Sequence, residues 1–140
     1  MTVPLDTLNY KVFENGNWVD VMLIQNKLDI GHCKIDYDSD SLIITEWYIN
    51  SEYRHRGLGR LLLDKTLKIV IQNLGYLPAK IEYIWNGKNE YVLDWLTKNF
   101  NAKDIGDLNQ KKYSPADTWE NHRYTLNREN FVKYFNLGHI

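Results

Sequence analysis

Two glycines and three arginines gather in the segment Arg54-His55-Arg56-Gly57-Leu58-Gly59-Arg60, where a phosphate could bind. Glycine allows a tight backbone path and lets amide groups approach a ligand closely. Where a helix begins, its first amides have no intrahelical partners and the helix dipole is positive. An anion is stabilised at such a place, and arginine adds charge-assisted hydrogen bonds to phosphate oxygens. The segment therefore predicts a binding site for a phosphate or a pyrophosphate.

Other chemical motifs with glycine, histidine or cysteine do not fit the chain. A dinucleotide fingerprint G-x-G-x-x-G starting at Gly57 would need glycine where Leu62 stands. No run matches the P-loop or the G-x-S-x-G elbow, and the histidines form no zinc spacing with Cys33, so we predict no metal. Two other readings of the segment stay open: a plain turn with a solvated basic face, and a nucleic-acid patch. A net charge of −1 lacks the basic excess of a dedicated nucleic-acid binder.

The elements around the segment predict a strand before it and a helix after it. Leu42–Ile49 is rich in β-branched and aromatic residues, which strands prefer. From Gly59 to Leu74 the apolar residues recur with helical period, and Gly75 and Pro78 follow as stop signals. Strands are also predicted at Asn9–Phe13, Trp18–Gln25, Asp29–Tyr37, Lys80–Trp85, His122–Leu126 and within Asn101–Leu108, a helix from Asn89 to about Asn99, and a short helix or loop at Arg128–Phe135.

This order of elements predicts an α/β (α+β) fold with a mixed sheet. Leu42–Trp85 has the length of a strand–helix–strand crossover. We predict one domain over residues 1–140, since 140 residues suit a single core. The chain has one cysteine, no apolar run of about 20 residues and no basic-then-apolar start. These features indicate a cytoplasmic protein without disulfides or membrane spans.

The segment and its surroundings resemble the GNAT superfamily of N-acetyltransferases. The family pattern [Q/R]-x-x-G-x-[G/A], between a central strand and a long helix, is filled here by Arg54 to Gly59. A tyrosine before the arginine, Tyr53, is also typical, and Asn89 through Phe100 looks like the family's second signature region. The resemblance covers roughly residues 42–101. It implies a mostly antiparallel central sheet flanked by helices, with an N-terminal region shortened to strands where members usually place two helices.

The resemblance implies an acetyl-CoA-dependent N-acetyltransferase that acts on a primary amine of a small molecule or a protein. Acetyl-CoA would be the acyl-donor substrate, with the backbone of Trp47-Tyr48-Ile49 holding its thioester and pantetheine arm. The residues expected to bind it are Trp47, Tyr48, Ile49, Arg54, His55, Arg56, Gly57, Leu58, Gly59, Arg60 and Asn89. Asn89 could instead only cap its helix. Family members often dimerise through their C-terminal strands, and the aromatic tail Trp119–Phe135 is compatible with a homodimer.

Acyl transfer to an amine needs a group that removes a proton from the amine. Glu46 is our first candidate, because strand alternation places it on one face with Ile44 and Tyr48, just before the expected thioester site. Glu82 in the next strand is the second candidate. For both, an ordinary surface or cross-strand ion pair is the alternative.

The leaving thiolate needs a proton donor. Tyr124 is the candidate that we carry forward, with Tyr83 and Tyr91 as others, and packing is the alternative role for each. Trp95 stands where the family often has the tyrosine that protonates the thiolate. A GNAT-fold protein that binds CoA or a protein partner without efficient turnover therefore stays open as a second function.

Overall fold

The computed structural model describes residues 8–85, 90–106 and 122–137. In chain order the elements are β1 (Leu8–Asn15), β2 (Trp18–Gln25), β3 (Leu28–Tyr37), β4 (Ser41–Ile49), η2 (Ser51–Tyr53), α1 (Leu58–Leu74), β5 (Lys80–Trp85), α2 (Glu90–Phe100), β6 (Lys103–Gly106), β7 (His122–Leu126) and α4 (Arg128–Tyr134). The strand order is β1-β2-β3-β4-β5-β7-β6. The pairs β1–β2, β2–β3, β5–β7 and β6–β7 are antiparallel. The predicted α/β class with a mixed, mostly antiparallel sheet is confirmed.

The chain divides into two compact units. The first contains residues 1–37 and 44–77, and the second contains residues 38–43 and 78–140. The first unit holds β1 to β3, most of β4, and α1. The second holds the start of β4 and all elements from β5 onward. The prediction of one domain over 1–140 stays a prediction.

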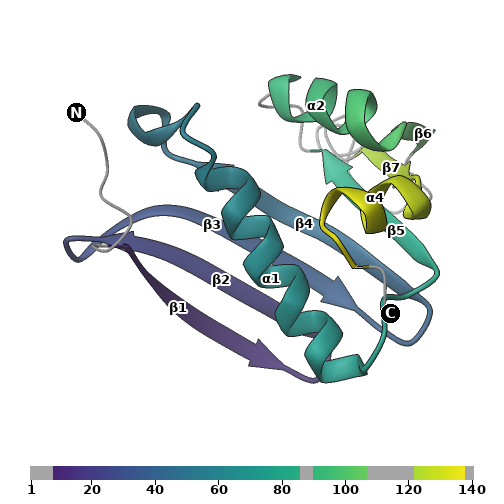
Figure 1. Cartoon of the computed structure of the whole chain (residues 1–140), viewed down its shortest axis with the longest axis horizontal. Helices are drawn as coiled ribbons and strands as arrows, with labels where there is room; N and C mark the ends of the chain where they lie inside the picture. Colours follow the sequence, from purple (N-terminus) through teal and green to yellow (C-terminus); the bar gives the residue numbers. More distant parts are fainter. Residues whose placement is uncertain (1–7, 86–89, 107–121, 138–140) are drawn as a thin grey trace, which may run out of the picture. The chain divides into compact units, whose positions relative to one another are not determined.

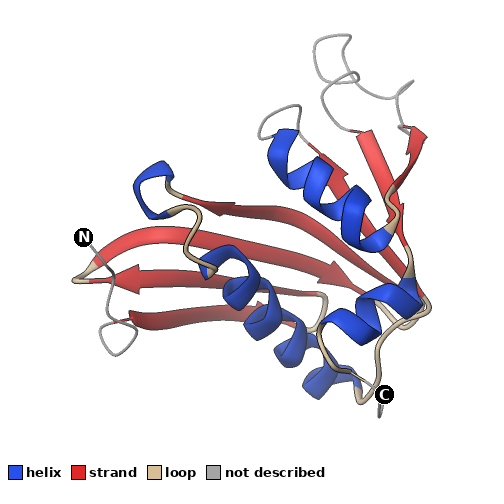
Figure 2. Cartoon of the chain, turned by 45° about the horizontal axis from the view of Figure 1, so that its top comes forward, coloured by secondary structure: helices blue, strands red, loops and turns tan. Residues whose placement is uncertain are grey.

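In the first unit α1 covers one face of the strands. Figure 1 shows α1 crossing over β2 and β3, and Figure 2 shows the helix on one side of these strands. Alternate residues of β2 and β3 face the helix and are buried, because successive side chains of a strand point to opposite faces. The core on this side is formed by Val19, Val21, Leu23, Cys33, Ile35, Leu62, Leu63, Leu67 and Val70.

Cys33 lies inside this core, opposite Val21 in the β2–β3 register. Its side chain is fully buried, and its thiol hydrogen-bonds to Thr66 of α1. Burial raises the pKa of the Cys33 thiol to about 12, because the charged thiolate would lose its solvation. Cys33 is thus a small buried core residue.

One extra residue interrupts the pairing of β2 with β3. Leu23 pairs with Gly31, whereas Ile24 pairs with Asp29, so Ile30 has no partner and forms a β-bulge. Ile30 and Gly31 are both buried, which breaks the alternation that the rest of β3 follows. Beyond the bulge, every side chain of β3 lies on the face opposite to the one that an unbroken ladder would give it.

Short turns join neighbouring strands of the first unit. Asn15 Oδ1 accepts hydrogen bonds from the amides of Asn17 and Trp18, at 2.7 and 3.2 Å. Asn26 and Lys27 both have positive φ, at 50° and 69°, as a tight two-residue hairpin requires. At the end of α1, Gly75 adopts φ 85° and donates its amide to the Ile71 carbonyl at 2.6 Å, a left-handed C-cap.

In the second unit, helices α2 and α4 pack against each other through aromatic side chains. The Phe100 ring lies 5.0 Å from Phe131 and 5.3 Å from Tyr134, between centroids. Trp95 contacts Phe100 and Tyr134 edge-on, at 5.4 and 5.3 Å. Offset and edge-on contacts of this kind are favourable because of the ring quadrupoles. The segment Arg128–Phe135, predicted as a helix or a loop, is helical over Arg128–Tyr134.

We expect Gly31→Ala to destabilise the protein by about 1–3 kcal/mol through overpacking. The added Cβ would lie 2.5 Å from Ile49 Cδ1 and 2.9 Å from the Tyr48 carbonyl oxygen, so β3 and β4 would have to separate. Gly16→Ala is the control, since a Cβ there meets nothing within 4 Å. Denaturant unfolding measures both changes, and equal stability of the two variants would contradict the close contact.

Candidate functional site

The turn between β4 and α1 is built from residues in unusual backbone conformations. After η2, Arg54 is extended, with φ −74° and ψ 164°. His55 then has φ 64°, and Gly57, the N-cap of α1, has φ 79°. Glycine adopts this left-handed conformation without strain, whereas histidine does so at some cost. The chain thereby reverses within a few residues and enters the helix at Leu58.

Two side chains, one from β4 and one from the turn, hold the turn against β4 by hydrogen bonds. Trp47 Nε1 donates to the Gly59 carbonyl at 2.9 Å, and Arg54 Nε donates to the Ile49 carbonyl at 2.8 Å. A Cβ on Gly59 would lie 3.7 Å from Ile49 Cγ1 and 3.8 Å from Trp47 Cζ2. Trp47 and Ile49 therefore lie on the side of β4 that faces α1. The first turn of the helix is held against the last residues of the strand.

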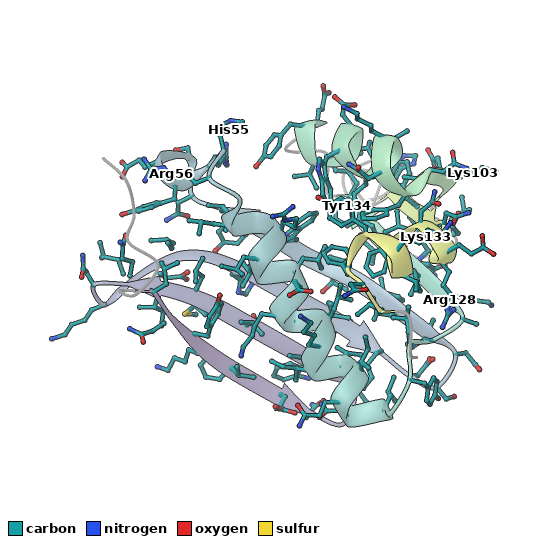
Figure 3. All side chains as sticks on the ribbon, in the orientation of Figure 1. His55, Arg56, Lys103, Arg128, Lys133 and Tyr134 are labelled. Carbon is teal, nitrogen blue, oxygen red and sulfur yellow. The ribbon has the colours of Figure 1, made fainter. Side chains whose placement is uncertain are left out.

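The turn presents backbone amides and positive charge. Leu61 donates to the Gly57 carbonyl at 3.1 Å, so the amides of Leu58, Gly59 and Arg60 precede the first i to i−4 bond of the helix. Gly57 supplies no side chain to cap them, and the first turn of α1 holds no acidic residue. His55, Arg56 and Arg60 are exposed, and Figure 3 shows His55 and Arg56 on the turn that leads into α1. This arrangement can hold an anion.

The other predicted donor-binding residues occupy different positions. Leu58 and Ile49 are buried, with 3% and 6% exposed, so their side chains are not available to a ligand. Tyr48 is 38% exposed on the face of β4 away from α1, and its ring lies 5.4 Å from that of His32. Asn89 lies outside the described residues.

Glu46 shares the face of β4 away from α1 with Tyr48 and contacts His32, which in turn contacts Asp20. The sequence singles out neither His32 nor Asp20 as a partner of Glu46. His32 Nδ1 lies 2.9 Å from Asp20 Oδ1, and His32 Nε2 lies 3.3 Å from Glu46 Oε2. The three residues come one each from β2, β3 and β4. A cross-strand contact of the kind that the sequence offered as the alternative for Glu46 is present, because His32 Nε2 and Glu46 Oε2 are within hydrogen-bond distance.

Burial and nearby carboxylates both raise pKa values on the face of β4 away from α1. Burial raises the pKa of the Asp20 carboxyl; His32 opposes the shift and Glu46 adds to it. Burial also raises the pKa of Tyr48, and the carboxylates of Asp29, Glu46 and Asp20 add to the effect. Tyr48 thus stays neutral in a field of three carboxylates.

The remaining catalytic candidates lie in the second unit. Glu82 is 9% exposed, and its Oε1 lies 3.8 Å from Arg123 Nε. Tyr124 pairs with Tyr83, whereas Glu82 pairs with Thr125, so Glu82 and Tyr124 lie on opposite faces of the sheet. Burial, followed by the charge of Asp104, raises the pKa of Tyr124. These two side chains do not converge on one point.

Of the other aromatic candidates, one is exposed to solvent and one packs against other rings. Tyr91, on α2, is 42% exposed. Trp95 is partly buried in the α2–α4 aromatic cluster described above. The aromatic tail Trp119–Phe135 lies partly outside the described residues, and the homodimer stays a prediction.

A comparison with protein families matches residues 9–88 to the model of the acetyltransferase (GNAT) family. This match covers more than half of the chain. The chain belongs to the GNAT acetyltransferase family. The glycine turn of this chain, Arg54 to Gly59, lies inside the matched region.

Solved structures share the fold of this GNAT protein at low sequence identity. A GNAT family acetyltransferase from Elizabethkingia anophelis with acetyl-CoA bound is 14% identical, with a TM-score of 0.58, over 87% of this chain and 99% of that one. An acetyltransferase of the GNAT family from Staphylococcus aureus is 18% identical, with a TM-score of 0.58, over 81% and 69%. The PaiA N-acetyltransferase from Thermoplasma acidophilum in complex with coenzyme A is 14% identical, with a TM-score of 0.55, over 79% of this chain. The match spans 61% of the Thermoplasma protein's length.

No curated protein sequence matches the chain. Among the helices that the structure describes, none has the length and apolar character needed to cross a membrane.

The two glycines of the turn should differ in their effect on stability. Gly57→Ala is expected to cost about 1 kcal/mol, because alanine must adopt φ 79° although its Cβ meets nothing within 4 Å. Gly59→Ala should instead stabilise by about 0.5–1 kcal/mol, since the residue is helical and a Cβ makes only ordinary contacts there. Thermal or denaturant unfolding of both variants checks the sign; a shared sign would contradict the backbone geometry.

Proposed function

We propose that this GNAT protein transfers an acetyl group from acetyl-CoA to a primary amine, of a small molecule or a protein, by direct attack in a ternary complex. The observation that carries the proposal is the β4–α1 turn, where first-turn amides and exposed arginines gather at a helix N-terminus whose first turn holds no acidic residue. The pyrophosphate of CoA would lie against these amides. Arg54 braces the turn through its bond to Ile49, while the exposed Arg56 and Arg60 would meet phosphate oxygens.

The end of β4 would receive the rest of the donor. In the proposed complex the backbone of Trp47-Tyr48-Ile49 holds the pantetheine arm and the thioester. Polarising the thioester oxygen needs one well-placed backbone amide as the tetrahedral intermediate forms. Holding both reactants together in the reactive geometry supplies much of the remaining rate enhancement. Few side chains are therefore needed for the chemistry itself.

Glu46 is the proposed base. Its side chain is 54% exposed, so an amine can reach it from the face of β4 away from α1. An incoming ammonium gives one proton to the base, and the free amine then attacks the thioester carbon. The C–S bond breaks as the intermediate collapses, and the proton lost by nitrogen ends on the CoA thiolate. The products are an amide, CoA and one proton on the base.

A second function, CoA binding without efficient turnover, is favoured by one observation. Trp95 stands where the family often has the thiolate-protonating tyrosine, and it packs into the α2–α4 aromatic cluster. Thermal shift with acetyl-CoA, followed by thiol release with a panel of amines, separates the two functions. Binding without thiol release would favour the second.

Arg56→Ala and Arg60→Ala should each weaken acetyl-CoA binding about tenfold or more, because each removes a charged hydrogen bond worth about 1.5–3 kcal/mol. Lys68→Ala is the matched control: it removes a cation from the same helix, two turns further on, whose side chain is 62% exposed. Calorimetric titration measures the three affinities. Equal losses in all three would indicate a nonspecific charge effect and contradict the site.

Glu46→Gln should lower kcat about 10²-fold or more, since a general base typically contributes 10²–10⁴-fold. The affinity for acetyl-CoA should change little, because Glu46 lies away from the turn. Glu52→Gln, an exposed residue of η2, serves as the control that neutralises a carboxylate near the turn. Thiol release at saturating amine measures kcat, and an unaltered rate in Glu46→Gln would place the base elsewhere.

A further inference from the structure

Asp20, His32 and Glu46 form a row across β2, β3 and β4, on the face of the strands away from α1. His32 Nδ1 lies 2.9 Å from Asp20 Oδ1, and His32 Nε2 lies 3.3 Å from Glu46 Oε2. One nitrogen or oxygen atom from each of the three side chains lies within 4.8 Å of the other two. Two carboxylates from strands that are not neighbours therefore converge on one imidazole.

The two contacts of the imidazole differ in geometry. The contact of Nε2 with Glu46 has the geometry of a hydrogen bond. Asp20 Oδ1 is shielded from solvent and has no hydrogen-bond partner among the described residues. A neutral imidazole has one N–H and one nitrogen lone pair. With the N–H on Nε2, the ring donates to Glu46, and the lone pair of Nδ1 is left beside Asp20 Oδ1.

The spacing of Nδ1 and Asp20 Oδ1 is that of two ligands on one cation. In this form of the ring no proton lies between the two atoms, although they are only 2.9 Å apart. Bonds from zinc to nitrogen or oxygen are about 2.0–2.2 Å long, so neighbouring ligands of one ion lie about 3 Å apart. A cation bound to both atoms would also satisfy the buried oxygen, which is costly to leave without a partner.

His122 shows the other arrangement, in which a hydrogen bond joins an imidazole to a carboxylate. Its Nδ1 lies 3.3 and 3.2 Å from the two carboxylate oxygens of Asp104, and both contacts have the geometry of hydrogen bonds. A proton on Nδ1 is sufficient to explain that pair. The contact of His32 with Asp20 is shorter and yet lacks this geometry, so a shared proton does not explain it.

The charges around Asp20 suit a divalent cation. Glu46 and Asp29 add negative charge near this carboxylate, and Lys34 supplies a positive one. Three carboxylates and one ammonium group leave an excess of two negative charges beside the ring. A divalent ion would balance this excess and relieve the repulsion between the carboxylates.

We propose that Asp20 Oδ1 and His32 Nδ1 bind a divalent transition-metal ion such as Zn²⁺, with Glu46 orienting the imidazole through Nε2. Imidazole nitrogen suits such ions, whereas Mg²⁺ and Ca²⁺ prefer oxygen ligands. A metal-bound histidine usually donates its second N–H to a carboxylate or a carbonyl, and Glu46 takes that place. Water would complete the coordination.

The sequence predicts no metal because its histidines have no zinc spacing with Cys33. Such spacing concerns ligands that lie close in the chain, whereas Asp20 and His32 meet through the register of β2 with β3. Cys33 has no part in the proposed site, since its side chain is fully buried in the core on the α1 side. The donor set is therefore one imidazole with carboxylate oxygen.

The test is a calorimetric titration of the full chain, free of any affinity tag, with zinc chloride in a buffer that does not chelate. We expect one Zn²⁺ per chain and much weaker binding of Mg²⁺. His32→Gln and Asp20→Asn each remove a ligand and should weaken zinc binding about tenfold or more. Glu46→Ala removes the orienting carboxylate and should weaken it about 10–100-fold, as is typical for partners of metal ligands.

Two variants are matched controls. His122→Gln removes a second histidine that pairs with a carboxylate, at 3.2 Å from Asp104. Asp36→Asn removes a carboxylate from the same strand as His32, and its Oδ1 is likewise buried without a hydrogen-bond partner among the described residues. Both variants should bind Zn²⁺ with the wild-type affinity.

The proposed site is refuted if the wild type binds no Zn²⁺ at millimolar concentration. Wild-type affinity in a folded His32→Gln or Asp20→Asn, or an equal loss in the two controls, also refutes it and leaves a purely structural role for the row. Should both ligand variants fail to fold, Glu46→Ala decides, and an unaltered affinity there refutes the site. The titration contains neither acetyl-CoA nor amine, so its result is independent of the proposed acetyl transfer.

Discussion

A single extra residue in β3 decides which side chains face α1. The turn at Asn26 and Lys27 pairs Gln25 with Leu28, and an unbroken ladder from there would place His32 opposite Val21, inside the core. The bulge at Ile30 shifts the pairing by one, so that Cys33 takes that place. His32 moves to the other face, in line with Met22. A buried imidazole would have disrupted the core, whereas here it meets two carboxylates.

The alternation of side chains along β4 likewise places residues with different proposed roles on opposite faces of the strand. Trp47 and Ile49 face α1 and hold the turn where the donor's phosphates would bind. Glu46 and Tyr48 face the other side, among the carboxylates of Asp20 and Asp29. The turn held by Trp47 and Ile49 carries the exposed Arg56 and Arg60, whereas carboxylates are more numerous than cations around Asp20 on the other side. An anionic donor and a cationic acceptor would each meet the side whose charge attracts it.

Local patterns in the sequence were sufficient to predict most of the fold. β2, β5 and β7 have the predicted bounds, and the helix predicted from Gly59 begins one residue earlier. The glycine turn was predictable because its conformation depends on residues adjacent in the chain. The Asp20–His32–Glu46 row was not, since its members are 12 and 14 residues apart and meet only through the strand register. The bulge sets that register, and its mark, two adjacent buried residues at Ile30 and Gly31, is visible in the structure and not in the residue types.

The same bulge would also make the proposed acyl transfer easy to observe. The chain has one cysteine, and the register turns its thiol into the core, where burial raises its pKa to about 12. A thiolate is the form that reacts with disulfide reagents, so the folded protein contributes no colour to such an assay. In a test of the proposed transfer, every equivalent of reagent consumed in the presence of the folded protein would then count one molecule of released CoA. When the first unit unfolds, the protein adds one further equivalent, so the same reagent reports the loss of the fold.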